Sequence, residues 1–245
     1  MNKFTGLIRR CVDDYSMIEE GDKIAVGVSG GKDSLALLCG LANLQRYYPK
    51  KYELYAITLD MGYEEMDFTP IKELCRRLNV PYIIKKTRIK EVVFEQREEK
   101  NPCALCAKMR RGSLHDAMLE LGINKIALGH HYDDAVETFI LSLFYEGRIS
   151  CFQPVTYMSR KNVTQIRPML YVGENTIKSL AKRYALPVVK NPCPMDGESK
   201  RQEVKELVGE LTSKYPDLKG KIFGAMQRFP LDGWEPNEYA RRPLP

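Results

Sequence analysis

The chain has 245 residues, and 38 basic against 32 acidic side chains give it a net charge of +6 at pH 7. Its 44% hydrophobic and 29% charged residues are typical of one large globular domain, or a domain with an appendage, and exclude a disordered or fibrous chain. The longest apolar runs, such as residues 35–41, fall far short of the ~20 residues that cross a bilayer, and the start lacks a signal-peptide pattern. We therefore expect a cytoplasmic protein without membrane contact, and the mild positive charge favours an anionic partner.

Short runs rich in Val and Ile alternate with amphipathic segments in the first part of the chain. Strands are expected at residues 23–28, 54–59, 82–86 and 125–128, and helices at 32–45, 70–78, 104–121 and 132–145. In the second helix we expect Thr69 as the N-cap and Pro70 as the first helical residue. Such alternation predicts right-handed βαβ units, hence a Rossmann-like α/β fold with a parallel sheet and helices on both faces.

The second half of the sequence is less regular. We expect a short strand pair at residues 155–157 and 164–166, followed by helices at 174–185, 200–215 and 217–227. The pattern predicts an α/β domain over residues 1–190 and a helical C-terminal extension over residues 191–245.

A polar, glycine-rich turn follows the first strand and opens the first long helix; it consists of Ser29, Gly30, Gly31, Lys32, Asp33 and Ser34. Two adjacent glycines let the backbone approach an anion, and a helix N-terminus directs N–H groups and partial positive charge toward it. A Walker loop would need glycine in place of Val26, and no dinucleotide fingerprint fits these glycines. We therefore expect a phosphate-binding loop and not a plain strand-to-helix turn.

This turn resembles the pyrophosphate loop of the PP-loop ATPases at every fixed position of Ser-Gly-Gly-x-Asp-Ser. The resemblance implies the adenine nucleotide alpha-hydrolase-like fold, and ATP that is cleaved between its α and β phosphates. Adenylate would pass to a substrate oxygen, with Lys32 and Asp33 acting as catalytic as well as nucleotide-binding residues.

Two other segments of interest lie where the second and fourth strands end, at the same edge of the sheet. Asp60 ends the second strand, where such sheets bind adenosine, and Gly129 and His130 follow the fourth. Asp133 and Asp134 come next, and we expect them to act in catalysis and hold Mg²⁺, which prefers carboxylate oxygen. The alternative is that the two aspartates are acidic residues of a helix cap and that the histidines are packed or capping residues.

The seven cysteines fall into groups. In a reducing compartment an odd number does not indicate disulfides, and Cys11, Cys39 and Cys75 lie in apolar helical surroundings typical of a core. Cys103 and Cys106 form a C-x-x-C after Asn-Pro, and Asn-Pro recurs before a third cysteine; the cysteines of these two motifs are Cys103, Cys106 and Cys193. Proline makes both turns rigid, and we expect nearby cations and the helix start to lower the thiol pKa values.

Four interpretations of these three cysteines remain open. They are a thioredoxin-like pair, a structural zinc site completed by His115 or His131, packing without chemistry, and a [4Fe–4S] cluster that leaves one iron open.

The motifs together resemble the tRNA 2-thiocytidine synthetase family of PP-loop ATPases over roughly residues 10–230. The resemblance rests on the order of residues 29–34, Cys103 to Cys106, Arg110 to Gly112, Gly129 to Asp134 and Ile166 to Pro168. It implies an iron–sulfur enzyme that adenylates a cytidine carbonyl in tRNA and replaces its oxygen by sulfur. The implied cofactors are ATP, Mg²⁺ and a [4Fe–4S] cluster on Cys103, Cys106 and Cys193.

The implied partners are tRNA, presented through an anticodon-loop base, and a sulfur donor such as a cysteine desulfurase or sulfide. A homodimer is a further expectation. Lys108, Arg110 and Arg111 flank the cysteines and would contact tRNA phosphates, although a basic run can also be a solvated helix face. Residues 146–153 depart from the family pattern and add the thiol of Cys151, so a small thiolated base stays open as the substrate. Two other classes also stay open: an amide- or amine-forming PP-loop ligase with structural zinc, and a non-catalytic nucleotide sensor.

Overall fold

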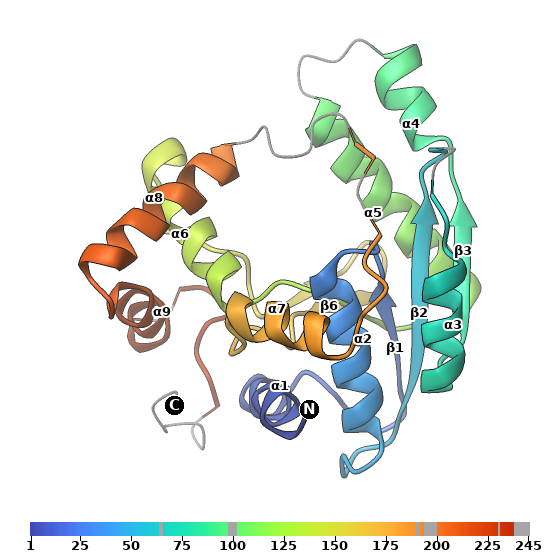
Figure 1. Ribbon diagram of the computed structural model, residues 1–245, viewed down its shortest axis with the longest axis horizontal. Helices are drawn as coiled ribbons and strands as arrows, with labels where there is room; N and C mark the ends of the chain where they lie inside the picture. The colour runs from blue at the N-terminus through green and yellow to red at the C-terminus, as the bar shows by residue number, and fades with distance from the viewer. Residues whose placement is uncertain (64–65, 98–101, 190–191, 194–199, 230, 238–245) are drawn as a thin grey trace.

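The computed structural model describes residues 1–63, 66–97, 102–189, 192–193, 200–229 and 231–237 (Figure 1). The strands are β1 (Asp22–Gly27), β2 (Tyr52–Asp60), β3 (Tyr82–Lys86), β4 (Lys125–Ala127), β5 (Val155–Met158) and β6 (Val163–Ile166). The helices are α1 (Asn2–Asp14), α2 (Lys32–Gln45), α3 (Thr69–Leu78), α4 (Ile89–Glu91), the π-helical turn η1 (Val92–Gln96), α5 (Pro102–Glu120), α6 (Tyr132–Glu146), α7 (Glu174–Arg183), α8 (Lys200–Lys214) and α9 (Leu218–Arg228).

The six strands form one sheet in the order β3-β2-β1-β4-β6-β5, parallel except for β5, which runs antiparallel to β6. The chain builds outward from β1 through β2 to β3 and then returns to add β4 on the other side of β1. In such sheets ligands bind where the strand order reverses, outside the carboxyl ends of the strands. The loops after β1 and β4 therefore flank the expected binding crevice.

Helices cover both faces of the sheet, which confirms the predicted fold class. Alternate residues of β1 point to opposite faces: Ile24 and Val26 belong to the larger core, whereas Ala25 belongs to a smaller one. Ala117 and Met118 of α5 close the smaller core, and the larger one is closed by helices that include α1, α2, α6 and α7. Cys11, Cys39 and Cys75 are buried in the larger core, as predicted.

Two helical segments were not anticipated from the sequence. The first is α1, whose buried Phe4, Ile8, Cys11 and Val12 form one apolar stripe against the core. The second is the short α4 with η1. The start of α3 also differs, because Thr69 is its first residue and not its cap. The Thr69 N–H donates instead to the Asp67 carboxylate at 2.8 Å, so an aspartate two residues earlier satisfies this helix end.

The described part of the C-terminal extension packs on the α/β domain. Helices α8 and α9 contact α6, and Phe223 and Trp234 are buried in the larger core, where their rings meet edge to face at 5.3 Å. The division of the chain at residue 190 stays a prediction. No helix in the described ranges is long and apolar enough to cross a membrane.

Candidate nucleotide and cysteine site

The glycine-rich loop is stabilised by hydrogen bonds to the hydroxyls of its own two serines. The Ser34 hydroxyl accepts from the Ser29 N–H at 3.2 Å and donates to the Gly31 carbonyl at 3.0 Å, while the Gly31 N–H donates to the Ser29 hydroxyl at 3.3 Å. Gly30 has φ +84°, a left-handed conformation that favours glycine. The two serines thus hold the loop in shape in addition to offering hydroxyl groups.

The N-terminus of α2 is left open by this loop. No described side chain caps it, and its cap residue Gly31 is extended. Uncapped N–H groups at a helix start, with the helix dipole behind them, form an anion site. Lys32 lies at this start, 3.0 Å from the Asp33 carboxylate and 3.2 Å from Glu174 of α7. Burial opposes the charge of Lys32, but these two carboxylates outweigh it and raise its pKa.

The loop after β4 packs directly on the start of α2. A Cβ atom on Gly129 would lie 3.1 Å from the Ser34 nitrogen and 3.2 Å from the Asp33 carbonyl carbon. Only glycine fits this close approach of two backbones without displacing one of them. The structure therefore brings Gly129 and the phosphate-loop residues together at the switch point, as the order of the motifs predicts.

The two aspartates that follow are engaged in protein contacts. Asp133 accepts from Lys219 of α9 at 2.6 Å and from the Glu174 N–H at 2.7 Å. Asp134 accepts from the His131 N–H at 2.9 Å in a capping box of α6, and its other oxygen lies 3.2 Å from Arg201. Both carboxylates therefore hold helices in place, and a role for them at Mg²⁺ stays a prediction.

Two buried polar atoms beside the loop lack a hydrogen-bond partner among the described residues, namely Asp33 Oδ1 and His130 Nδ1. Burial, with the charge of Arg167, lowers the pKa of His130 to about 4, so its ring is neutral near pH 7. That ring packs on Phe152 with centroids 4.8 Å apart. His130 is thus a neutral, half-buried polar group in the loop after β4.

Asp60 lies at the carboxyl end of β2, where its side chain accepts from the Gly62 N–H at 3.0 Å. This turn presents Tyr63, whose hydroxyl lies near the Cys193 thiol. Burial, followed by the neighbouring Cys193 and Cys106, raises the pKa of Tyr63 to about 12. Sequence reasoning missed Tyr63, because a tyrosine in a loop carries no motif.

The three motif cysteines lie near one another at this edge, within the range of electrostatic interaction. Cys106 interacts electrostatically with both Cys103 and Cys193 although Cys193 is distant in sequence. The segment before Cys193 is tied to the phosphate loop, since the Val189 N–H donates to the Gly30 carbonyl at 3.0 Å. None of the seven cysteines, all within the described ranges, is in a disulfide. Asn101, Asn191 and Pro194 of the two motifs lie outside the described residues.

The expected lowering of the thiol pKa is wrong for Cys106. Burial raises its pKa, and the opposing effect of Arg110 is smaller. In the described part of the chain, no three His, Cys, Asp or Glu side chains form a group that could hold a metal ion.

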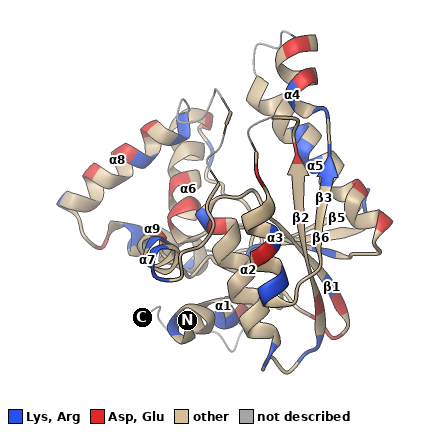
Figure 2. Ribbon diagram, turned by 45° about the vertical axis from the view of Figure 1, so that its right-hand side comes forward, with Lys and Arg blue, Asp and Glu red and all other residues tan. Residues whose placement is uncertain are grey.

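The predicted basic residues Lys108, Arg110 and Arg111 are all exposed on α5, the helix that carries Cys103 and Cys106 (Figure 2). Arg110 is close enough to Cys106 to affect its pKa. The structure thus places exposed positive charge beside the cysteines.

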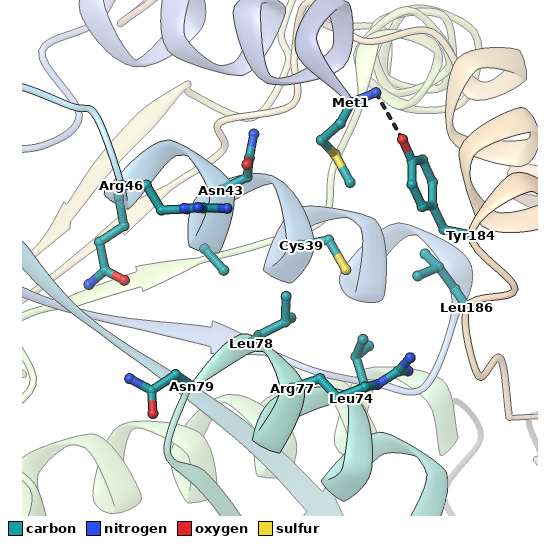
Figure 3. Close-up of a pocket in the computed structure, with 12 residues that line it drawn as sticks. Met1, Cys39, Asn43, Arg46, Leu74, Arg77, Leu78, Asn79, Tyr184 and Leu186 are labelled. Atoms are coloured by element: carbon teal, nitrogen blue, oxygen red, sulfur yellow. Dashed lines mark hydrogen bonds between the residues drawn. The ribbon is translucent and has the colours of Figure 1, made fainter.

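A separate cavity of about 530 Å³, partly open to solvent, lies between α2 and α3 and is also lined by Met1, Tyr184 and Leu186 (Figure 3). Its lining contains none of the predicted site residues. The candidate site at the carboxyl edge of the sheet is therefore separate from this cavity.

Sequence reasoning also missed the charged residues of the C-terminal half that form ion pairs with site residues or with one another. They are Glu174 of α7, Arg201 and Lys205 of α8, and Lys219 of α9. A charge on a surface helix is too common to signal a site. The packing of α7 on α2 brings Glu174 to the loop, and the packing of α8 and α9 on α6 brings the three basic residues to this region.

This chain is similar to proteins of known family. The PP-loop domain family matches residues 3–211. The tRNA-cytidine(32) 2-sulfurtransferase of Syntrophotalea carbinolica is 38% identical over 92% of this chain and 87% of its own, and that of Geobacter sulfurreducens 37% over 91% and 88%. Among solved structures, the U34-tRNA thiolase NcsA of Methanococcus maripaludis, with its [4Fe-4S] cluster, superposes with a TM-score of 0.73. It is 25% identical, and the match covers 91% of this chain and 77% of that one. The chain therefore belongs to the PP-loop family and, within it, to the family of the tRNA-cytidine 2-sulfurtransferases.

Proposed function

We propose that this protein is an ATP-dependent tRNA sulfurtransferase that adenylates the C2 carbonyl of a cytidine and replaces its oxygen by sulfur. The observation that carries the proposal is that the phosphate loop and the motif cysteines lie at one edge of the sheet. The Val189 N–H is bonded to Gly30 of the phosphate loop, and Cys193 follows four positions later beside Tyr63 and Cys106. The named relatives act on cytidine 32, so we propose the same tRNA position for this chain.

The proposed roles at ATP follow from the loop. Backbone N–H groups at the start of α2 hold the phosphates, and Lys32 stabilises the charge that develops on them when the carbonyl oxygen attacks the α phosphate. Asp60 lies at the end of β2 on the adenosine side. For Mg²⁺, Asp33 fits because its buried Oδ1 has no hydrogen-bond partner within the described residues.

The three cysteines supply thiolates, which are the usual ligands of an iron–sulfur cluster. Thiols that hold such a cluster bind different irons, so they need not be as close as the ligands of a single ion. Cys103, Cys106 and Cys193 would be the ligands, and a cluster held by three thiols supplies one iron with an open position for sulfur. Exposed Cys103 borders the solvent, from which a sulfur donor would approach.

The tRNA would approach over α5. Lys108, Arg110 and Arg111 are exposed on this helix next to the cysteines, where they can pair with phosphates. A base in a single-stranded loop is the cheapest to unstack, which suits an anticodon-loop cytidine. We further propose that the protein acts in the cytoplasm, receives sulfur from a cysteine desulfurase or sulfide, and forms a homodimer.

The test is the nucleoside content of tRNA. The chain is expressed in a bacterial strain that lacks 2-thiocytidine, and digested tRNA is analysed by mass spectrometry. We expect 2-thiocytidine with the wild type and with Cys75→Ala, whose thiol is buried in the core, but none with Cys106→Ala. Wild-type protein that binds iron and cleaves ATP yet yields no thiolated cytidine would overturn the proposed substrate.

A further inference from the structure

Three lysines surround one carboxylate next to the phosphate loop. Oε1 of Glu174 lies 3.2 Å from Nζ of Lys32 and accepts from Nζ of Lys205 at 3.0 Å. Oε2 accepts from Nζ of Lys178 at 3.1 Å. The Glu174 side chain is only 13% exposed, so these contacts are partly shielded from water. The lysines come from three different helices: α2, α7 and α8.

The charges of this lysine cluster do not balance. Among the described residues, the carboxylates within ion-pair distance of these lysines are those of Glu174 and of Asp33, which lies 3.0 Å from Lys32. Glu137 also interacts electrostatically with Lys205, but burial raises its pKa to about 7, so it carries only part of a negative charge near pH 7. The neighbouring Asp133 adds no net charge, because it is paired with Lys219 at 2.6 Å. The three ammonium groups thus face two carboxylates. Since the cluster lies at the open N-terminus of α2, it is electrostatically suited to an anion that carries several negative charges.

Lys205 is held in this position by its helix. Val204 and Val208 of α8 are buried in the larger core. One turn earlier, Arg201 donates to Thr138 of α6 at 3.1 Å and to Asp134 at 3.2 Å. Because α8 is anchored on both sides of Lys205, the base of this side chain is fixed, and the ammonium group of the 41% exposed side chain is held beside the loop by its contact with Glu174.

We propose that Lys205 is a polyphosphate-binding residue. Together with Lys32 it binds the β and γ phosphates of ATP and then the released pyrophosphate. Glu174 is the positioning residue: it keeps both lysines at one carboxylate oxygen until phosphate oxygens replace it. In this way α8 would provide a positive charge that contacts the pyrophosphate leaving group, in addition to its structural role. The inference rests on the proposed ATP-dependent function.

The experiment measures the binding of inorganic pyrophosphate, ATP and AMP to the full chain by titration calorimetry. AMP lacks the β and γ phosphates, so it separates contacts to the leaving group from contacts to the nucleoside. A charge-assisted hydrogen bond to phosphate predicts that Lys205→Met weakens pyrophosphate and ATP binding by about tenfold or more and leaves AMP unchanged. Lys205→Arg keeps the charge and should retain most of the affinity.

The matched control is Lys200→Met, which removes a lysine from the same helix at a site where it pairs with Glu203. This variant should bind all three ligands like the wild type. Glu174→Gln removes the competing charge and should tighten pyrophosphate binding several-fold. A merely structural role for Glu174 would weaken it instead.

The outcomes separate the inference from the function on which it rests. If the wild type binds ATP and pyrophosphate and Lys205→Met binds them equally well, the inference is overturned and the proposed function stands. A loss of AMP binding equal to that of pyrophosphate also overturns it, because Lys205 would then act on the fold. If the wild type binds neither ATP nor pyrophosphate, the proposed function itself fails.

Discussion

Replacement of Gly129 by alanine tests the physical link between the fold and the nucleotide site. The new methyl group would lie 3.1 Å from the Ser34 nitrogen and 3.2 Å from the Asp33 carbonyl carbon. Both atoms belong to the backbone of the first turn of α2, so no side chain can rotate away to make room. The start of α2 must therefore move away from the loop after β4.

The magnitude follows from two opposing effects. Overpacking of a tight contact costs about 1–3 kcal/mol. Alanine also has less freedom than glycine in the unfolded chain, which returns about 0.4–1 kcal/mol. We expect Gly129→Ala to lower the free energy of unfolding by about 1–2 kcal/mol. ATP binding should weaken by about tenfold, because the displaced N–H groups lose one charge-assisted hydrogen bond.

The measurements are urea unfolding and ATP titration of the purified protein. Gly209→Ala is the control: this glycine is exposed inside α8, and a Cβ there would meet nothing within 4 Å. It should stabilise the protein by up to about 1 kcal/mol and leave ATP binding unchanged. If Gly129→Ala unfolds and binds ATP like the wild type, the close approach does not shape the nucleotide site.

Three further predictions address the metal, the reaction and the pH dependence of stability. Anaerobically purified protein should contain about four irons per chain by metal analysis, lost in Cys103→Ala, Cys106→Ala and Cys193→Ala but kept in Cys75→Ala; stoichiometric zinc would refute the cluster. Lys32→Ala should slow ATP consumption, and chromatography of the wild-type products should give AMP and pyrophosphate; ADP and phosphate would contradict the PP-loop chemistry. Burial raises the pKa of Glu137 from 4.5 to about 7, so from about pH 4.5 to 7 the unfolded chain loses this proton while the folded chain retains it. The free energy of unfolding should therefore fall as the pH rises through this window, and Glu137→Gln should reduce that fall in urea titrations at several pH values; an unchanged slope would show that Glu137 is not responsible.

The parts of the site that depend on local sequence could be predicted. The conformation of residues 29–34 is set by Gly30, by the Ser29 and Ser34 hydroxyls and by the helix that follows, all within six positions. The order of strands and helices then brings Gly129 to the same edge, because the carboxyl ends of parallel strands share one side of a sheet. The α/β fold and the burial of Cys11, Cys39 and Cys75 followed from apolar periodicity in the same way.

The parts that depend on long-range packing could not be predicted. Lys205 meets Glu174 only because α8 docks on α6, and nothing near Lys205 in the sequence differs from an ordinary charged helix. Tyr63 meets Cys193 across more than a hundred residues. Asp133 and Asp134 illustrate a different problem. Carboxylates in a phosphate-binding protein suggest Mg²⁺, and the sequence does not show whether they face the ligand or a lysine.

The contacts of those two aspartates give them a structural role beside the nucleotide site, whether or not they also bind Mg²⁺. Asp133 joins α9 through Lys219 to the first N–H of α7, and Asp134 joins α8 through Arg201 to the start of α6. Each carboxylate therefore satisfies a helix N-terminus and neutralises a cation from the C-terminal half in one step. Without Asp133, Lys219 would lose its carboxylate partner, and without Asp134, α8 would lose part of its anchor through Arg201. The alignment of Lys205 with Lys32 thus depends on acidic residues that act through helix ends, at a distance from the phosphates themselves.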